Sequence, residues 1–113
     1  MSEYLWNTKK AILFSYLASR LEIWAYEKGY LLTRGWAKRT QTIQKEIYGE
    51  MRPTLHEWCR AQDYTLFIIN SEGRYVWIKD GNHPAWKKIA DKAEELGLKS
   101  GRKWDDINHV ELG

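Results

Sequence analysis

The apolar run at residues 64–69 constrains the fold of this chain more than any other segment. Its sequence, Tyr-Thr-Leu-Phe-Ile-Ile, is aromatic, aliphatic or β-branched throughout, which is typical of a strand covered on both faces. A turn sequence follows at residues 71–73, and a second strand pattern occupies residues 74–78. We therefore expect a β-hairpin whose first strand runs from about residue 63 to residue 70, with both faces covered.

A helix is predicted for residues 8–28. Apolar residues recur there at helical spacing, and Gly29 follows as a candidate C-cap. The periodic positions are Leu13, Leu17, Leu21 and Trp24. We expect these side chains to face the core.

The remaining elements complete an α+β pattern. Residues 30–33 predict a short strand, and helices are expected at residues 40–48 and 84–96. A basic, glycine-containing loop at residues 99–103 leads to a last strand at residues 108–112. The sequence thus predicts about three helices against a small, mostly antiparallel sheet.

Composition bounds the class of protein. With 113 residues the chain fits one domain, residues 1–113. A single cysteine, Cys59, excludes an internal disulfide. The net charge of +3 and a pI near 9.0 mildly favour an anionic partner, such as a cell-wall polymer or nucleic acid.

The N-terminal residues do not predict a signal peptide. Their lysines precede only a short apolar stretch, residues 11–17, which is interrupted by Ser15 and runs into charge. No stretch is long and apolar enough to predict a transmembrane span. We therefore expect a protein made in the cytoplasm, without a membrane as partner.

Two segments carry candidate metal ligands. Residues 54–63 have the form [S/T]-x-H-x(4)-A-x-D, which provides His56 and Asp63. We expect Asp63 to open the strand predicted for residues 63–70 and His56 to lie on the preceding loop, with the two side chains converging. The alternative for His56 is an ordinary solvated or hydrogen-bonded loop histidine.

The second segment, residues 106–112, has the form D-x-x-H on the last predicted strand. On a strand, His109 and Glu111 share one face while Val110 and Leu112 share the other. We expect His109 to face a cleft that Asp106 also reaches, with Glu111 orienting a ligand. The alternative is a half-buried edge strand that ends in polar residues.

Together the two segments offer two imidazoles, one carboxylate ligand and one spare carboxylate. A catalytic zinc site needs three protein ligands, an open position for water and a base beside it. The sequence therefore predicts a zinc centre.

In these segments the chain resembles the bacterial and phage zinc D-Ala-D-Ala carboxypeptidases, dipeptidases and L-alanyl-D-glutamate endopeptidases. The resemblance includes residues 35–40 and extends over nearly the whole chain. It implies the hedgehog-like fold of that family and one catalytic domain. It also implies His56, Asp63 and His109 as Zn²⁺ ligands, Asp106 as the catalytic carboxylate, and Arg39 as the residue that stabilises the oxyanion or grips the substrate.

Some positions leave alternatives open. Cys59 stands where many relatives have glycine, and its spacing from His56 also allows a thiolate ligand. Residues 80–83 repeat the D-x-x-H form, but Pro84 follows, so we interpret His83 as a residue near a helix N-terminus. The role of Arg39 has nearby competitors, of which Arg34 and Lys38 are two.

The expected function is a zinc peptidase that cuts peptidoglycan stem peptides, as phage endolysins do. Such an enzyme waits in the cytoplasm of the host bacterium and reaches the cell wall after release. We expect a monomer that binds no nucleic acid. The alternatives are a D-Ala-D-Ala carboxypeptidase or dipeptidase acting on wall precursors, a non-catalytic basic phage binding protein, and a relative that has lost its metal.

Overall fold

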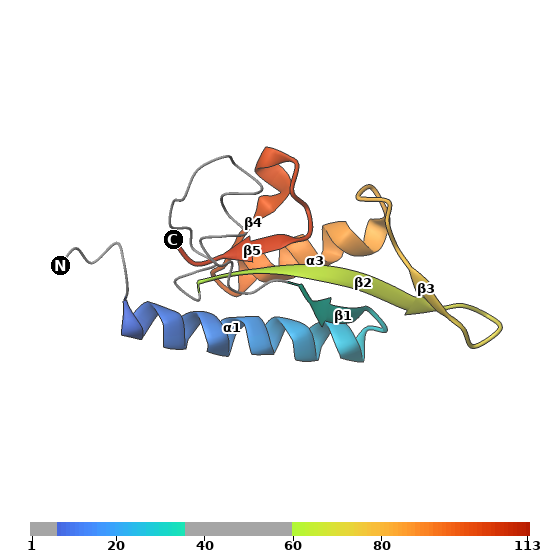
Figure 1. Ribbon diagram of the computed structural model, residues 1–113, viewed down its shortest axis with the longest axis horizontal. Helices are drawn as coiled ribbons and strands as arrows, with labels where there is room; N and C mark the ends of the chain where they lie inside the picture. The colour runs from blue at the N-terminus through green and yellow to red at the C-terminus, as the bar shows by residue number, and fades with distance from the viewer. Residues whose placement is uncertain (1–6, 36–59) are drawn as a thin grey trace, which may run out of the picture.

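A computed structural model of the protein describes residues 7–35 and 60–113 (Figure 1). Its helices and strands belong to the α+β class, as expected. They are α1 (Thr8–Glu27), β1 (Leu31–Arg34), β2 (Ala61–Ile69), β3 (Tyr75–Trp77), α3 (Pro84–Glu95), β4 (Lys99–Ser100), the 3-10 helix η1 (Gly101–Trp104) and β5 (His109–Glu111). Two α-helices lie in the described part, and the helix predicted for residues 40–48 lies outside it.

The five strands form a sheet in which each pairing is antiparallel. The order β1-β2-β5-β4 places β2 at the centre, with β1 along one edge. The other edge of β2 is shared, because β5 pairs with residues 61–63 and β3 pairs with residues 67–69. The predicted antiparallel sheet is therefore confirmed, and its central strand has two ends with different neighbours.

Both helices pack against one face of this sheet. Even-numbered residues of β2, Tyr64 and Leu66, join the core together with side chains from α1 and α3. Val110 of β5 joins the same core, because it lies opposite Gln62 and paired residues share a face. In Figure 1, α1 runs along the sheet and α3 lies behind it. The two described helices thus both lie on this one face of the sheet.

The helix α1 buries a stripe that differs in part from the predicted one. Leu17 and Leu21 are buried as expected, but Leu13 is 44% exposed, and Phe14 occupies the core instead. The end of the helix matches the prediction. Gly29 has φ of 84°, a left-handed conformation that glycine adopts without strain, and it turns the chain into β1.

The expectation that both faces of β2 are covered is wrong for its second half. Gln62, Tyr64 and Leu66 are buried, the odd-numbered residues from Asp63 to Phe67 are half-buried, as is Ile68, and Ile69 is 53% exposed. Helices cover one face of an antiparallel sheet here, so the apolar sequence of the strand overstates its burial.

A buried tyrosine ties α1 to the sheet. The hydroxyl of Tyr64, which is 2% exposed, donates to Glu22 Oε2 at 2.7 Å. The guanidinium of Arg34 binds the same carboxylate through Nε at 2.8 Å and Nη2 at 3.1 Å. Burial and the hydrogen bond to Glu22 hold the pKa of Tyr64 well above its usual range, so the phenol stays protonated. These contacts fix the register of β1 and β2 relative to the helix.

Candidate metal centre

Strand register brings Asp63 and His109 together. In the antiparallel pairing of β2 with β5, these two residues are direct Cα partners, although they are far apart in sequence. Paired residues share a face, and Glu111 lies two residues beyond His109, so all three side chains are on the face opposite the helices. Asp63 is the third residue of β2, which begins at Ala61, so the expectation that Asp63 opens the strand is wrong.

The imidazole of His109 is buried between two carboxylates. It is 7% exposed, and its Nδ1 lies 2.8 Å from Asp63 Oδ1 while its Nε2 lies 2.8 Å from Glu111 Oε1. Burial alone lowers the pKa of His109, but the hydrogen bonds to Asp63 and Glu111 outweigh it and raise the pKa to about 9. Without a metal, the ring is therefore a protonated cation near neutral pH, neutralised by the acids around it.

Asp106 reaches the same imidazole from a tight turn. Its Oδ2 lies 3.9 Å from His109 Nδ1, and its side chain is 47% exposed. Its backbone carbonyl accepts from the backbone N–H of His109 at 3.0 Å, and its own N–H donates to the carbonyl of Gly101 at 2.9 Å. The preceding residue, Asp105, has φ of 58°, a left-handed conformation that aspartate tolerates. The D-x-x-H spacing thus folds Asp106 back onto His109.

Gly101 permits this turn because it has no side chain. A Cβ built on Gly101 would lie 2.0 Å from the carbonyl oxygen of Asp106 and 3.0 Å from Cβ of His109. Real carbon atoms do not approach backbone oxygen so closely. Position 101 therefore requires glycine, because a side chain would collide with the backbone of Asp106. The same close approach holds Asp106 near His109.

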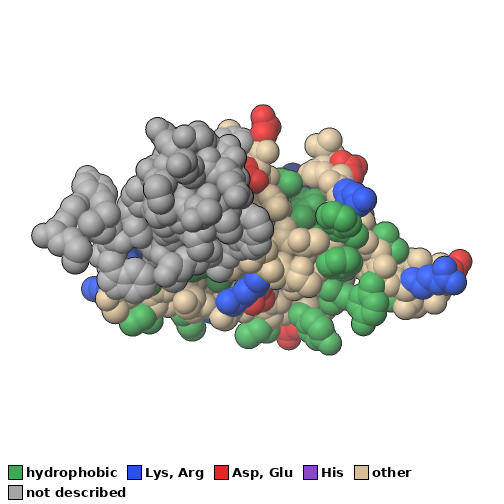
Figure 2. Space-filling model, in the orientation of Figure 1, with side chains coloured by type: hydrophobic (Ala, Val, Ile, Leu, Met, Phe, Trp, Pro, Cys, Tyr) green, Lys and Arg blue, Asp and Glu red, His purple; other side chains and the backbone are tan. Residues whose placement is uncertain are grey.

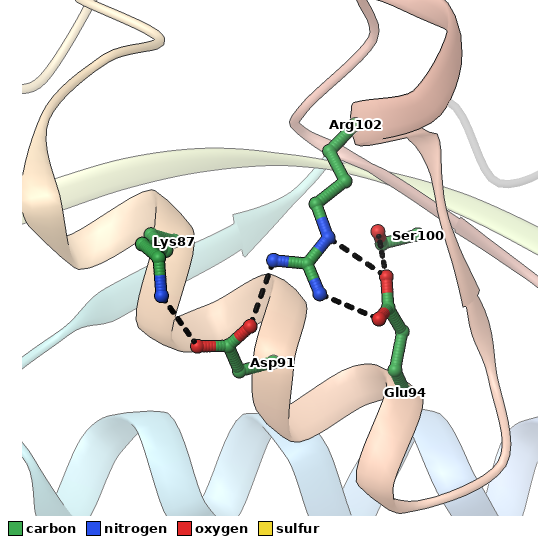
Figure 3. Close-up of polar contacts among 5 residues, drawn as sticks. All are labelled: Lys87, Asp91, Glu94, Ser100 and Arg102. Atoms are coloured by element: carbon green, nitrogen blue, oxygen red, sulfur yellow. Dashed lines mark hydrogen bonds and ion pairs between the residues drawn. The ribbon is translucent and has the colours of Figure 1, made fainter.

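An ion-pair network anchors η1, and with it Gly101, to α3 (Figure 3). Arg102 binds Asp91 at 2.7 Å and binds Glu94 through two nitrogens at 2.9 and 2.5 Å. Ser100 donates to Glu94 Oε2 at 2.7 Å. The hydrogen bonds from Arg102 are the main cause that holds the pKa of Asp91 and Glu94 below their usual range. The turn that carries Asp106 is therefore tied to a helix on the core side.

The donor set suits a divalent metal ion. Asp63, Asp106 and His109 each offer one ligand atom, and these atoms lie within 4.8 Å of one another. Carboxylate oxygen and imidazole nitrogen are ligands for zinc and for several other divalent metals, so the set alone does not select zinc. This group can hold a metal ion, and two of its members are half-buried while His109 is buried.

The residues predicted for the site divide into two sets. Asp63, Asp106 and His109 converge in the structure. His56 and Arg39 lie outside the described residues, as do Cys59 and Lys38, so their roles stay predictions.

The two described competitors have other contacts. His83 is the N-cap of α3, where its Nδ1 accepts from the backbone N–H of Ala85 at 3.1 Å, as the proline after it indicated. Arg34 binds Glu22, as described above. Sequence reasoning missed Gly101, whose only signal was a glycine in a segment that we interpreted as a basic loop.

A hollow of about 410 Å³ opens beside Asp106, and we call it the Asp106 hollow. It lies along the edge of β2, between the part that pairs with β5 and the part that pairs with β3. Its apolar lining includes Trp77, Trp86 and Ile107. Lys79 also lines it, with its Nζ 4.5 Å from the ring centroid of Trp77. Figure 2 shows hydrophobic side chains gathered between the grey residues and the loop after β3. The hollow falls within the size range of small-ligand pockets.

No family model matches the sequence, and a search of curated proteins finds no match. Among the described residues, no helix has the length and apolar character needed to cross a membrane.

Proposed function

We propose that this chain is a zinc-dependent peptidase that hydrolyses peptide bonds in peptidoglycan stem peptides, in the manner of a phage endolysin. The observation that carries the proposal is the convergence of Asp63, Asp106 and His109, which come from two segments that the sequence had paired as a metal motif. Asp63 and His109 would hold the metal together with His56, whose ligand role is a sequence prediction.

The donor chemistry fits zinc in a catalytic rather than a structural site. Structural zinc sites are closed by four protein ligands, often thiolates, whereas catalytic sites keep three and leave one position open. Here the donors are carboxylates and an imidazole, and Asp106 is exposed enough to reach solvent. Zinc, when bound, would act as a Lewis acid that activates water and polarises a peptide carbonyl.

The geometry supports different roles for the two aspartates. Asp63 lies 2.8 Å from the Nδ1 atom of His109, and its side chain is 19% exposed, which suits a ligand. Asp106 lies farther from the same atom, at 3.9 Å, and is 47% exposed, which suits a residue that must meet both water and substrate. We assign Asp106 as the general base that takes a proton and delivers it to the leaving amine.

Arg39 is proposed to stabilise the negative charge that develops on the carbonyl oxygen. An arginine suits that role because its guanidinium remains charged and presents several donors. Its competitor Arg34 is less suitable, since both of its bonds go to Glu22, on the helix side of the sheet. This leaves Arg39 and Lys38 as the candidates.

The Asp106 hollow gives a peptide a place to bind. Its apolar walls can receive the side chains of a stem peptide, and Lys79 supplies a positive charge for a peptide carboxylate. Because Asp106 lines the hollow, a peptide bound there would lie next to the proposed base. A D-Ala-D-Ala carboxypeptidase or dipeptidase would use the same chemistry, so the bond that is cut depends on this hollow.

A basic nucleic-acid-binding protein is the weaker candidate. Its binding surface would need a run of unpaired basic groups along a phosphate backbone. Two arginines of the described region, Arg34 and Arg102, are instead bound to carboxylates. We therefore keep the peptidase as the proposed function, with a monomer acting on the cell wall after release from the cytoplasm.

The test combines metal content with cleavage of purified peptidoglycan. Wild type should bind about one zinc per chain and release peptides that mass analysis identifies. His109→Ala should lose the metal, whereas Asp106→Asn should keep it and lose cleavage. Wild-type protein that binds no zinc near neutral pH, or an Asp106→Asn variant that cleaves at the wild-type rate, would overturn the proposal or the role of Asp106, respectively.

A further inference from the structure

The two nitrogens of His109 face different surroundings. On the Nδ1 side lie Asp63 Oδ1 at 2.8 Å and Asp106 Oδ2 at 3.9 Å. On the Nε2 side lies Glu111 Oε1 at 2.8 Å. The group of described residues that can hold a metal contains Asp63 and Asp106 but not Glu111. Among the described residues, the two aspartates of this group therefore lie on the Nδ1 side of the ring, and Nε2 points toward Glu111 instead.

We propose that His109 binds its metal through Nδ1, and that Glu111 is a positioning residue that accepts the hydrogen bond of the Nε2–H group. A neutral imidazole carries one proton, so a proton held on Nε2 leaves the lone pair of Nδ1 free for a metal. Metal-binding histidines commonly donate their second N–H to a carboxylate in this way. The inference rests on the proposed metal centre. It adds which nitrogen of His109 binds the metal and which residue holds the proton on the other nitrogen.

The backbone around Glu111 explains why its carboxylate can hold the ring. β5 lies between β2 and β4, and Glu111 has a Cα partner on each side, Ala61 and Lys99. Its side chain is 19% exposed and lies on the same face as that of His109. Pairing on both sides orders the backbone of Glu111, so less backbone freedom is lost when its side chain binds the imidazole.

The alternative is that Glu111 is itself a ligand and the metal lies on the Nε2 side. The measurement that separates the two is nuclear magnetic resonance of nitrogen-labelled protein loaded with cadmium in place of zinc. Spin coupling between cadmium and a ring nitrogen identifies the bound atom directly. We expect coupling to Nδ1 of His109 and a proton on Nε2. Coupling to Nε2, or no coupling to His109, would overturn the inference.

Three variants test the role of Glu111 without using enzyme activity. Glu111→Ala should lower zinc affinity about 10- to 100-fold, because the ring loses its partner. Glu111→Gln keeps an acceptor oxygen and should retain affinity within about tenfold of wild type. The control is Glu72→Ala, in the exposed turn between β2 and β3, which should leave affinity unchanged.

Thermal unfolding of each metal-free variant shows whether a loss of affinity is only a loss of fold. Equal loss in Glu111→Gln and Glu111→Ala would mean that the charge itself binds metal, and would overturn the positioning role. Unchanged affinity in Glu111→Ala would overturn it as well. The outcome is separable from the proposed function, because a protein that couples cadmium to Nδ1 but cleaves no peptide keeps this inference and loses the peptidase.

Discussion

The central strand β2 is built differently at its two ends. At the polar end, residues 61–63 pair with β5, and the acidic and imidazole groups of Asp63 and His109 are buried or half-buried. At the apolar end, residues 67–69 pair with β3, and Ile69, Tyr75 and Trp77 are each more than half exposed. Polar groups are inside and apolar groups outside, which is the reverse of the usual preference.

This difference shows what holds each end together. Buried charges are tolerated only where partners satisfy them, so the polar end depends on specific distances between named atoms. At the apolar end, the side chains of Ile69, Tyr75 and Trp77 keep much of their contact with water, so backbone pairing carries more of the stability there. We therefore expect substitutions of similar size to have large effects at the polar end and small effects at the apolar end.

The largest effect is expected from Gly101→Ala. The added methyl would lie 2.0 Å from the carbonyl oxygen of Asp106, so the turn has to move. Overpacking of this kind destabilises by about 1–3 kcal/mol, and here it also displaces Asp106 from His109. We expect a lower melting temperature and weaker zinc binding, measured by thermal unfolding and by metal titration.

Gly81→Ala is the matched control for that substitution. Its added methyl would lie 3.2 Å from Cγ2 of Ile107, a side-chain atom that can shift slightly. We expect a small change in stability and no change in zinc binding. Equal effects of the two substitutions would show that the close approach at Gly101 does not position the site.

Removal of the metal should give the polar end an unusual pH dependence. In the metal-free protein the pKa of His109 is raised from its ordinary value of 6.5 to about 9. A raised pKa adds stability that is full below about pH 6.5 and is lost as the pH rises through about 9. With zinc bound the trend should reverse, because protons compete with the metal for the imidazole.

Thermal unfolding with and without a chelator, at about pH 6 and about pH 9.5, measures this reversal. The chelated protein should melt at a higher temperature at the lower pH. The zinc-saturated protein should gain most from the metal at the higher pH. Parallel pH trends in the two forms would mean that His109 does not exchange a proton for the metal.

The sequence predicted the apolar framework well because its signals are local. Helical spacing, Gly29 and Pro84 located the two described helices, and the apolar run located β2. Burial was predicted less well. Leu13 and Ile69 are apolar but exposed, because the two described helices pack on the same face of the sheet and one stripe of α1 faces it.

The candidate site was predicted in its residues but not in its geometry. The two motifs indicated Asp63, Asp106 and His109, yet a two-residue error in the start of β2 placed Asp63 in the wrong part of the strand. The register that makes Asp63 and His109 partners is a long-range property, which no local pattern encodes. The contact of Gly101 with Asp106 is equally invisible, since it depends on a backbone approach rather than on a motif.

A smaller effect is expected from Arg102→Ala, which cuts the link between η1 and α3. The link consists of partly exposed ion pairs, so it adds little to global stability. Its loss should instead loosen the turn that carries Asp106, lowering zinc affinity by less than Gly101→Ala does. Arg74→Ala, which removes an exposed pair with Glu72 in the β2–β3 turn, is the control and should change neither quantity.

The same link predicts an acid-sensitive loosening. Because Arg102 lowers the pKa of Asp91 and Glu94, their pairing adds stability above the ordinary carboxylate pKa, and this is lost as the pH falls through the lowered values. Wild type should therefore lose protection from hydrogen exchange at η1 in acid, whereas Arg102→Ala should show little further loss. An equal acid response in both proteins would assign it to other groups.

The smallest effect is expected at the apolar end, from Ile69→Thr. Ile69 is the last residue of β2, it is 53% exposed, and threonine keeps the β-branched shape that suits a strand. The change in unfolding free energy should stay within about 0.5 kcal/mol, as for most surface substitutions, and zinc affinity should not change. Chemical denaturation and metal titration measure both. A loss as large as that of Gly101→Ala would mean that the exposed side chains of this end are covered in solution. The two ends of β2 would then differ in which groups cover them, and both would depend on buried contacts.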